Sequence, residues 1–241
     1  MLIVLGILVG VVSGFFGVGG GFVLIPLLLT IGFDMKTAIG VSVMQMVFSS
    51  IFGSYLNYKK RNLQLNSSIL VGLGGGVGAL GSGFIVTSLD ETTLKLLFVL
   101  ILVFAILQLL RPIDGKVQKD VHPFWLFSIG GGVGAVAISL GIGGSVLIVP
   151  LLVGLLYYPI KKAVSAGLFF VVFSSLFGFI SLSYYGQIEY MSGLIVGLAS
   201  IIGVSIGIWL KDRVNDKQHK RYILLLYCFI FLYMVQELIT G

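Results

Sequence analysis

Charged side chains are scarce in this chain. Aspartate, glutamate, lysine and arginine together make up 10% of its 241 residues, whereas 58% of the residues are hydrophobic. Soluble globular domains usually carry about 25% charged residues. The composition therefore excludes a soluble globular protein and predicts an integral membrane protein.

Cysteine and histidine are also rare. The single cysteine, Cys228, excludes an intrachain disulfide framework and a CxxC redox or zinc motif. His122 and His219 lie in polar flanks without metal-ligand partners at a suitable spacing, so we expect both to be ordinary surface residues. No arrangement of Ser, His and Asp and no paired carboxylates are available for hydrolysis, so we expect no enzyme, no metal and no cofactor.

Acidic residues are missing from the interiors of the apolar runs. They fall in predicted loops or near the end of a run, at Asp34, Asp90, Glu91, Glu189 and Glu237. Ionisable residues at membrane depth are typical of proton pathways. We therefore predict no proton relay built from carboxylates, and the coupling mechanism stays open.

What the chain does contain is long apolar runs. Most are 18 to 24 residues long, which suits a membrane-spanning helix and is too long for an outer-membrane strand of about 10 residues. The sequence thus predicts an all-α membrane protein with eight hydrophobic segments. The segments cover residues 2–31, 37–58, 67–88, 93–110, 123–157, 163–185, 191–210 and 222–240.

Segments 1 and 5 are too long for one crossing, at 30 and 35 residues. Each is interrupted near its middle by a glycine-rich motif followed by a proline, at 17–26 and 141–150. Non-helical backbone at membrane depth is tolerated only where protein or a water-filled cavity surrounds it. We therefore predict that both segments are re-entrant hairpins with their tips at the glycine motifs.

The chain also contains an internal duplication. The sequence Val-Phe-Ser-Ser-Ile-Phe-Gly at 47–53 returns as Val-Phe-Ser-Ser-Leu-Phe-Gly at 172–178, an offset of 125. The glycine motifs match at an offset of 124. This pattern predicts two four-segment repeats, 1–110 and 123–241, joined by a polar cytoplasmic linker, 111–122.

Lysine and arginine indicate the topology, because cytoplasmic loops carry an excess of them. Apart from Lys36 and Lys95, they gather in four clusters, at 59–61, 111–119, 161–162 and 211–221. Eight single crossings would place nine basic residues on one side and six on the other, whereas hairpins at segments 1 and 5 place thirteen against two. We predict the hairpin topology, and we read these clusters as topology signals rather than as a nucleic-acid site.

In that topology each repeat crosses three times and carries one hairpin. The second repeat is then inverted relative to the first. The two hairpins enter from opposite faces and meet near the midplane, and both termini lie outside the cytoplasm of a multi-pass membrane protein.

The hairpin tips are the predicted site. Free N–H groups and the positive end of a half-helix converge there, which favours an anion without a buried lysine or arginine. Neutral polar side chains beside the tips could complete the shell of an oxyanion. The candidate binding residues are Gly17, Gly19, Gly20, Gly21, Gln45, Ser49, Ser50, Ser139, Gly141, Gly143, Gly144, Ser145, Ser174 and Ser175.

Structural interpretations compete with this one. Serine in a membrane helix often bonds to its own helical turn, and glycines four residues apart, such as Gly74 and Gly78 or Gly130 and Gly134, favour helix packing. Gln45 has no polar counterpart, because Phe170 stands at the matching position. A site at the tips would therefore be asymmetric.

The sequence Gly-Phe-Phe-Gly-Val-Gly-Gly-Gly-Phe-Val-Leu-Ile-Pro at 14–26, its second copy and the four-plus-four arrangement resemble the TauE/SafE group of sulfite and sulfonate exporters. The resemblance extends over the whole chain. It implies transport of a small sulfur-containing anion, such as sulfite, sulfoacetate or thiosulfate, across the bacterial cytoplasmic membrane. The second copy departs from the pattern at Ser145, in place of the last tip glycine, and at Ile138, where the first copy has Gly14.

The leading hypothesis is thus a secondary transporter that holds an oxyanion between the tips and works by alternating access. A channel or passive facilitator and a membrane scaffold or accessory subunit remain as alternatives. The expected partners are the small anion and the lipid bilayer, and a homo-oligomer stays open.

Overall fold

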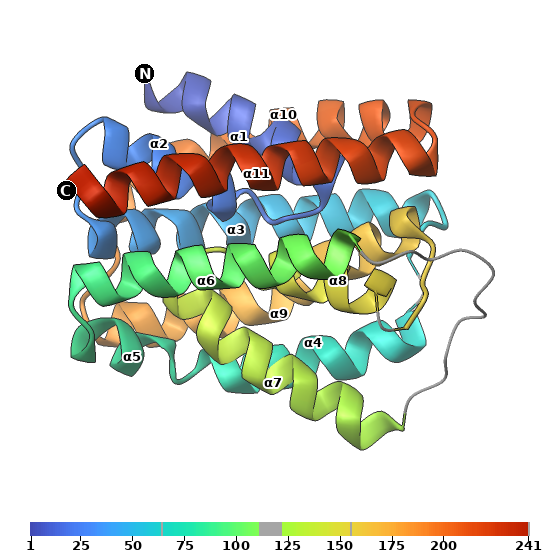
Figure 1. Cartoon of the computed structure of the whole chain (residues 1–241), viewed down its shortest axis with the longest axis horizontal. Helices are drawn as coiled ribbons and strands as arrows, with labels where there is room; N and C mark the ends of the chain where they lie inside the picture. Colours follow the sequence, from blue (N-terminus) through green and yellow to red (C-terminus); the bar gives the residue numbers. More distant parts are fainter. Residues whose placement is uncertain (64, 111–121, 155, 241) are drawn as a thin grey trace.

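A computed structural model describes residues 1–63, 65–110, 122–154 and 156–240, and Figure 1 shows them as a bundle of helices. No strand is present in these ranges, so the prediction of an all-α protein is confirmed. The helices are α1 (Leu2–Phe16), α2 (Gly21–Thr30), α3 (Met35–Lys59), α4 (Leu65–Ala79), α5 (Ser82–Ser88), α6 (Glu91–Leu110), α7 (Pro123–Ser139), α8 (Ser145–Gly154), α9 (Ile160–Tyr184), α10 (Tyr190–Arg213) and α11 (Asp216–Thr240).

Five helices, α3, α6, α9, α10 and α11, are long and apolar enough to cross a membrane. Helices α4 and α5 pass the same test together, although they are bent by 41° at their junction. The protein is therefore an integral membrane protein with several apolar spans. The helices match the predicted segments, with two differences. The predicted segment 67–88 is divided into α4 and α5, and α11 begins at Asp216, six residues before the predicted start at residue 222.

Segments 1 and 5 are each divided into two short apolar helices, α1 with α2 and α7 with α8. The breaks fall at the glycine motifs, as the sequence predicts. Helix α1 ends where Gly17 adopts a left-handed conformation, with φ of 70°, and its N–H donates to Ser13 O. Glycine adopts this conformation without the steric penalty that a side chain would bring.

Glycines bring pairs of helices into backbone contact. A Cβ atom at Gly10 of α1 would overlap with Ser200 of α10, and one at Gly14 would overlap with Val204. Since both residue numbers rise together, α1 and α10 run parallel. Helices α4 and α7 pack in the same way, because Cβ atoms at Gly74 and Gly78 would overlap with backbone atoms of α7. The packing interpretation of Gly74, Gly78, Gly130 and Gly134 is confirmed.

The remaining contacts order the other helices. Gly193 and Gly197 of α10 face Met44 and Phe48 of α3, so these two helices also run parallel. Helix α9 runs parallel to α4, since Gly72 and Gly76 face Phe173 and Phe177. Helices α3 and α9 are antiparallel, because Asn57 near the end of α3 bonds to Ser165 near the start of α9.

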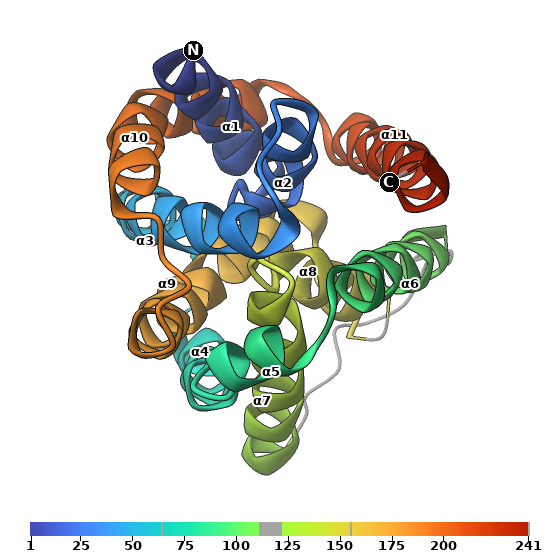
Figure 2. The ribbon, with the colours of Figure 1, turned by 90° about the vertical axis from the view of Figure 1, so that its left-hand side faces the viewer.

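These contacts define two groups of helices with opposite directions. Helices α1, α3 and α10 run one way, and α4, α7 and α9 run the other. In Figure 2, which looks along most of the helices, α1, α2 and α10 lie above α3, whereas α4, α5 and α7 lie below α9. Helices α6 and α11 pack together beside this stack.

The two ends of the bundle differ in charge. Figure 1 shows both termini at one end and the α3–α4 and α10–α11 connections at the other, which we call the basic end. The basic clusters at 59–61 and 211–221 lie at or next to those connections. Lys95 lies towards the opposite end, where its Nζ is 3.0 Å from Oε1 of Glu237 near the C-terminus. The cluster at 111–119 lies outside the described residues.

Glycine contacts in α7 give a matched test of the packing. A Cβ atom at Gly134 would overlap with Gly75 O, whereas one at Gly132 would meet nothing within 4 Å. Overpacking costs about 1–3 kcal/mol, so we expect Gly134→Leu to lower the melting temperature of the detergent-solubilised protein by about 5 °C or more. Gly132→Leu should melt like the wild type. Equal melting of the two variants would contradict the observed helix contact.

Candidate functional site

The two interrupted segments have the same backbone conformation at their tips. Tip 1 comprises residues 17–20 and tip 2 comprises residues 141–144, and the first, third and fourth residue of each is a glycine with positive φ. The φ angles are 70°, 75° and 87° at Gly17, Gly19 and Gly20, and 64°, 79° and 68° at Gly141, Gly143 and Gly144. The duplication therefore includes the backbone geometry that a side chain would strain.

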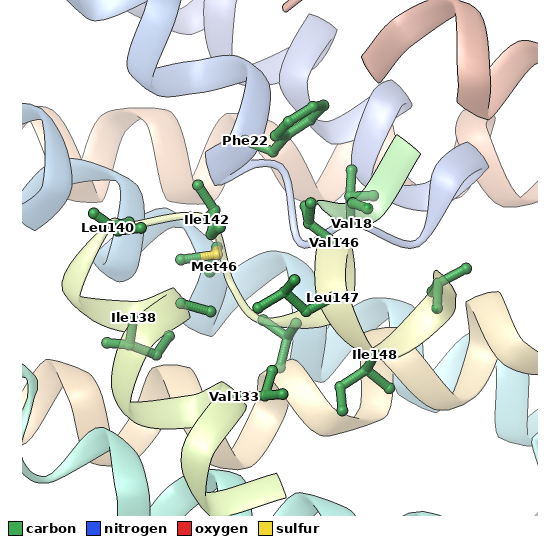
Figure 3. Close-up of a cluster of buried hydrophobic side chains, with 14 of the residues drawn as sticks. Val18, Phe22, Met46, Val133, Ile138, Leu140, Ile142, Val146, Leu147 and Ile148 are labelled. Atoms are coloured by element: carbon green, nitrogen blue, oxygen red, sulfur yellow. The ribbon is translucent and has the colours of Figure 1, made fainter. Parts of the chain in front are cut away.

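The tips meet inside the bundle. Gly21 packs against Gly141 O so closely that a Cβ atom would overlap with it, and Ser42 Oγ donates to the same carbonyl oxygen at 2.6 Å. Met46 Sδ lies between the tips, in contact with Gly19 and Gly143. Figure 3 shows Val18, Met46, Ile142 and Val146 gathered around this junction.

Several backbone N–H groups at the tips are unpaired. Within the described residues, the N–H groups of residues 18–22 have no hydrogen-bond acceptor, and neither do those of Gly143, Gly144 and Val146. These residues precede or begin the short helices α2 and α8, whose amino-terminal ends carry partial positive charge. Such a backbone arrangement is suited to bind an anion.

Helix α3 supplies the polar wall of tip 1. Gln45 is fully buried, contacts Gly20 through its side-chain amide, and has no hydrogen-bond partner for Oε1 or Nε2. Ser49, also fully buried, donates from Oγ to Gly19 O at 3.1 Å. A buried amide without partners is destabilising by about 1–3 kcal/mol. Gln45 is therefore the side chain at the tips with the most unused hydrogen-bonding capacity.

Helix α9 makes the wall of tip 2 apolar. The ring of Phe170 packs against Gly144, and Val171 stands where α3 has Met46. Ser174 Oγ donates to Phe170 O of its own helix at 3.3 Å. The asymmetry expected from Gln45 and Phe170 is thus present in the contacts.

Within the described part of the chain, the hydroxyl groups of the remaining predicted serines, Ser139, Ser175, Ser50 and Ser145, make no hydrogen bond to a tip. Ser139 and Ser175 donate to carbonyl oxygens of their own helices, Ala135 O at 2.7 Å and Val172 O at 3.5 Å, which agrees with their structural interpretation. Ser50 and Ser145 are buried, and their hydroxyl groups have no partner.

Sequence reasoning missed two residues at the junction, Ser42 and Met46. Both lie on the helical face that carries Gln45 and Ser49, because residues three and four apart on a helix are neighbours. Following that face back by one turn from Gln45 would have found Ser42. Met46 gives no such signal, since a methionine in an apolar run is ordinary.

The prediction that His219 is a surface residue is wrong. His219 is fully buried, and its Nε2 lies 2.8 Å from Phe15 O at the end of α1. The reason is that α11 begins at Asp216, which places His219 inside a packed helix rather than in a loop. Lys211, grouped above with the loop residues, lies inside α10 and is also fully buried.

Comparison with known proteins finds a family and several membrane-transporter relatives. Residues 2–234 match the family described as sulfite exporter TauE/SafE. A probable membrane transporter protein of Methanocaldococcus jannaschii is 30% identical, with 93% of this chain and 90% of that protein covered. The probable membrane transporter protein YunE of Bacillus subtilis is 24% identical, with 94% and 92% covered. No solved structure matches the chain.

The resemblance read from the glycine motifs is thereby confirmed, and it extends over nearly the whole chain. With its several apolar spans and these transporter relatives, the chain belongs to the TauE/SafE family of membrane transporters.

Proposed function

We propose that this protein is a secondary transporter for a small sulfur-containing oxyanion, such as sulfite, thiosulfate, sulfoacetate or a similar sulfonate. The anion is held between tip 1 and tip 2 by backbone N–H groups and by the amide of Gln45. The observation that carries the proposal is the close contact of two glycine tips with unpaired N–H groups, beside a fully buried, unpartnered glutamine at tip 1. The family description, sulfite exporter, supports the class of anion.

The proposal includes two inverted four-segment repeats. Helices at matching positions, α1 with α7, α3 with α9 and α4 with α10, run in opposite directions, which supports the inversion. Helix boundaries recur at the same offset as the sequence, since α3 covers Met35–Lys59 and α9 covers Ile160–Tyr184. Inverted repeats with binding at broken helices are a recurrent transporter design.

We place the basic end in the cytoplasm of a bacterial cell and both termini outside it. The position of the described basic clusters opposite the termini supports this orientation, because positive residues are retained on the cytoplasmic side. The two hairpins then enter from opposite faces of the cytoplasmic membrane.

Transport requires the helices to move. Val18, Gln45, Met46 and Val171 are fully buried, so an anion reaches the tips only after the surrounding helices separate. Each hairpin packs against helices of the other half, α1 on α10 and α7 on α4. Rocking of the repeats would therefore carry a hairpin together with its neighbours and expose the site to one side at a time.

The flux of labelled sulfite in proteoliposomes tests this function. A transporter predicts saturable uptake that is accelerated by unlabelled sulfite on the other side of the membrane. Linear flux without that acceleration would indicate a channel, and the absence of both binding and flux would indicate a scaffold or accessory subunit.

Gly143→Leu tests the tips. Gly143 has φ of 79° and contacts Met46, so a leucine there fits neither the backbone nor the space. We expect flux to fall to the level of empty vesicles, whereas Gly132→Leu, with open space at its Cβ, should keep wild-type flux. Membrane yield and monodispersity are measured for both. Wild-type flux from a well-folded Gly143→Leu variant would remove the tips from the mechanism.

Gln45→Met separates binding from stability. Removal of an unpartnered buried amide should leave the melting temperature of the ligand-free protein unchanged or raise it. A ligand that binds the native state stabilises it according to its affinity, so the rise in melting temperature caused by sulfite should disappear in the variant. Phe170→Met, at the matching position of the other repeat, should keep that rise. An undiminished sulfite response in Gln45→Met would show that the amide is not a ligand.

A further inference from the structure

A second polar cluster is buried near the basic end of the bundle. Lys211 Nζ of α10 lies 2.5 Å from Asn57 Oδ1 of α3 and 3.2 Å from Ser165 Oγ of α9. The charge of Lys211 also acts on His219 of α11, and all four side chains are fully buried. Helices from both halves of the molecule therefore enclose one ammonium group.

This ammonium group has no acidic partner. Among the described residues, no carboxylate oxygen lies within 4.0 Å of Lys211, and the neighbouring Asp212 pairs with Lys60 instead, at 2.6 Å. Only neutral oxygens accept hydrogen bonds from Lys211. A buried charge normally has an ionic partner because its desolvation is expensive. Lys211 lies in the last turn of α10, and what sets it apart from other lysines at helix ends is its complete burial without an ionic partner.

His219 adds a second unused group. Its Nε2 faces Phe15 O, which can only accept, so Nε2 carries the proton of that hydrogen bond. Its Nδ1 is buried without a partner. In the neutral ring Nδ1 accepts the proton of a hydroxyl group, as in hydrogensulfite, and in the charged ring it donates to an oxyanion.

The cluster lies next to tip 1, on the side of the basic end. Val164, the neighbour of Ser165, packs against Gly17, and His219 bonds to the last turn of α1. Lys211 near the end of α10 and His219 in the first turns of α11 flank the α10–α11 connection, which is at the basic end (Figure 1). The four residues therefore stand between tip 1 and the basic end of the molecule.

The other repeat has no such cluster. At the offset of 125, Lys211, Asn57 and His219 correspond to Val86, Leu182 and Leu94, and Ser165 corresponds to Gly40. Val86, Leu94 and Leu182 are also fully buried. Two matching environments in one duplicated fold thus differ in chemistry, since one is polar and charged and the other is apolar. Packing alone does not require the charge.

We propose that Lys211, Asn57, Ser165 and His219 form a second anion site, at which a small oxyanion pauses between the basic end and tip 1. This inference rests on the proposed transport function. Lys211 supplies the charge and His219 Nδ1 supplies a second polar group. Asn57, whose Nδ2 donates to Gly53 O, and Ser165, whose hydroxyl donates to Asn57 Oδ1, position the ammonium group. The substrate thereby meets a desolvated cation before it reaches the uncharged tips.

Asn57→Asp is the decisive variant. It places a carboxylate beside Lys211 at the position of an existing hydrogen bond, so the lysine gains an ion pair while it loses its capacity to bind an anion. A purely structural role for Lys211 predicts a variant that is as stable as the wild type and fully active. The anion site predicts a stable variant in which sulfite flux falls about ten- to hundredfold, the loss expected for one charge-assisted hydrogen bond.

Lys211→Met is the second variant and Lys162→Met its control, because Lys162 is an exposed lysine in the first turn of α9 and its loss changes the net charge equally. Melting temperature, sulfite flux and the sulfite-induced rise in melting temperature are measured for all proteins. We expect the flux of Lys211→Met to fall as in Asn57→Asp, and that of Lys162→Met to match the wild type.

The outcomes separate the two proposals. Wild-type flux in stable Asn57→Asp protein overturns the second site and leaves transport at the tips intact. If Lys211→Met fails to fold, the result for Asn57→Asp decides. A wild-type protein that neither binds nor moves sulfite, sulfate or thiosulfate overturns the transport function and the second site together.

Discussion

The structure depends on one constraint, that backbone polar groups in a membrane must find partners within the protein. The chain leaves the helical conformation at tips 1 and 2, and both tips are surrounded by α3 and α9. Ser42 and Ser49 satisfy tip carbonyls from α3, whereas several tip N–H groups stay unpaired. The protein therefore stabilises the acceptors at the junction and leaves its donors available, which is the arrangement that suits a negatively charged ligand.

Close packing between glycines holds this junction in place. Helix α1 belongs to the same half as α4, but it packs on α10, and α7 packs on α4 in return. Each broken segment therefore packs on a helix from the other half of the chain. The absence of side chains at Gly10 and Gly134 allows the backbones to touch. This arrangement couples the position of each tip to the position of the opposite half.

The sequence predicts the repeated parts of this structure well. Apolar run lengths, the two glycine motifs and the offset of 125 are local patterns, and the helices and their breaks follow them. The wrong prediction for His219 and the omission of Lys211 have another cause, because the burial of a polar residue depends on helices that are distant in the sequence. His219, for example, contacts Phe15 of α1, which lies 204 residues earlier in the sequence. Met46 was missed because a methionine in an apolar run is ordinary, and only the folded chain places it between the two tips.

Comparison of the two halves of the chain shows where the buried polar and charged side chains lie. The shared features are backbone features, namely helix boundaries, glycine angles and parallel packing. The polar side chains diverge: Gln45 faces Gly20 where Phe170 faces Gly144, and Lys211 is buried where Val86 is apolar. These polar groups lie around tip 1 and on its basic side. Under the proposed alternating access, a symmetric scaffold would give an anion the same surroundings on both faces. Placement of the charge and the amide around tip 1 makes the two halves of the proposed path unequal, because a cation lies on one side and apolar residues lie on the other.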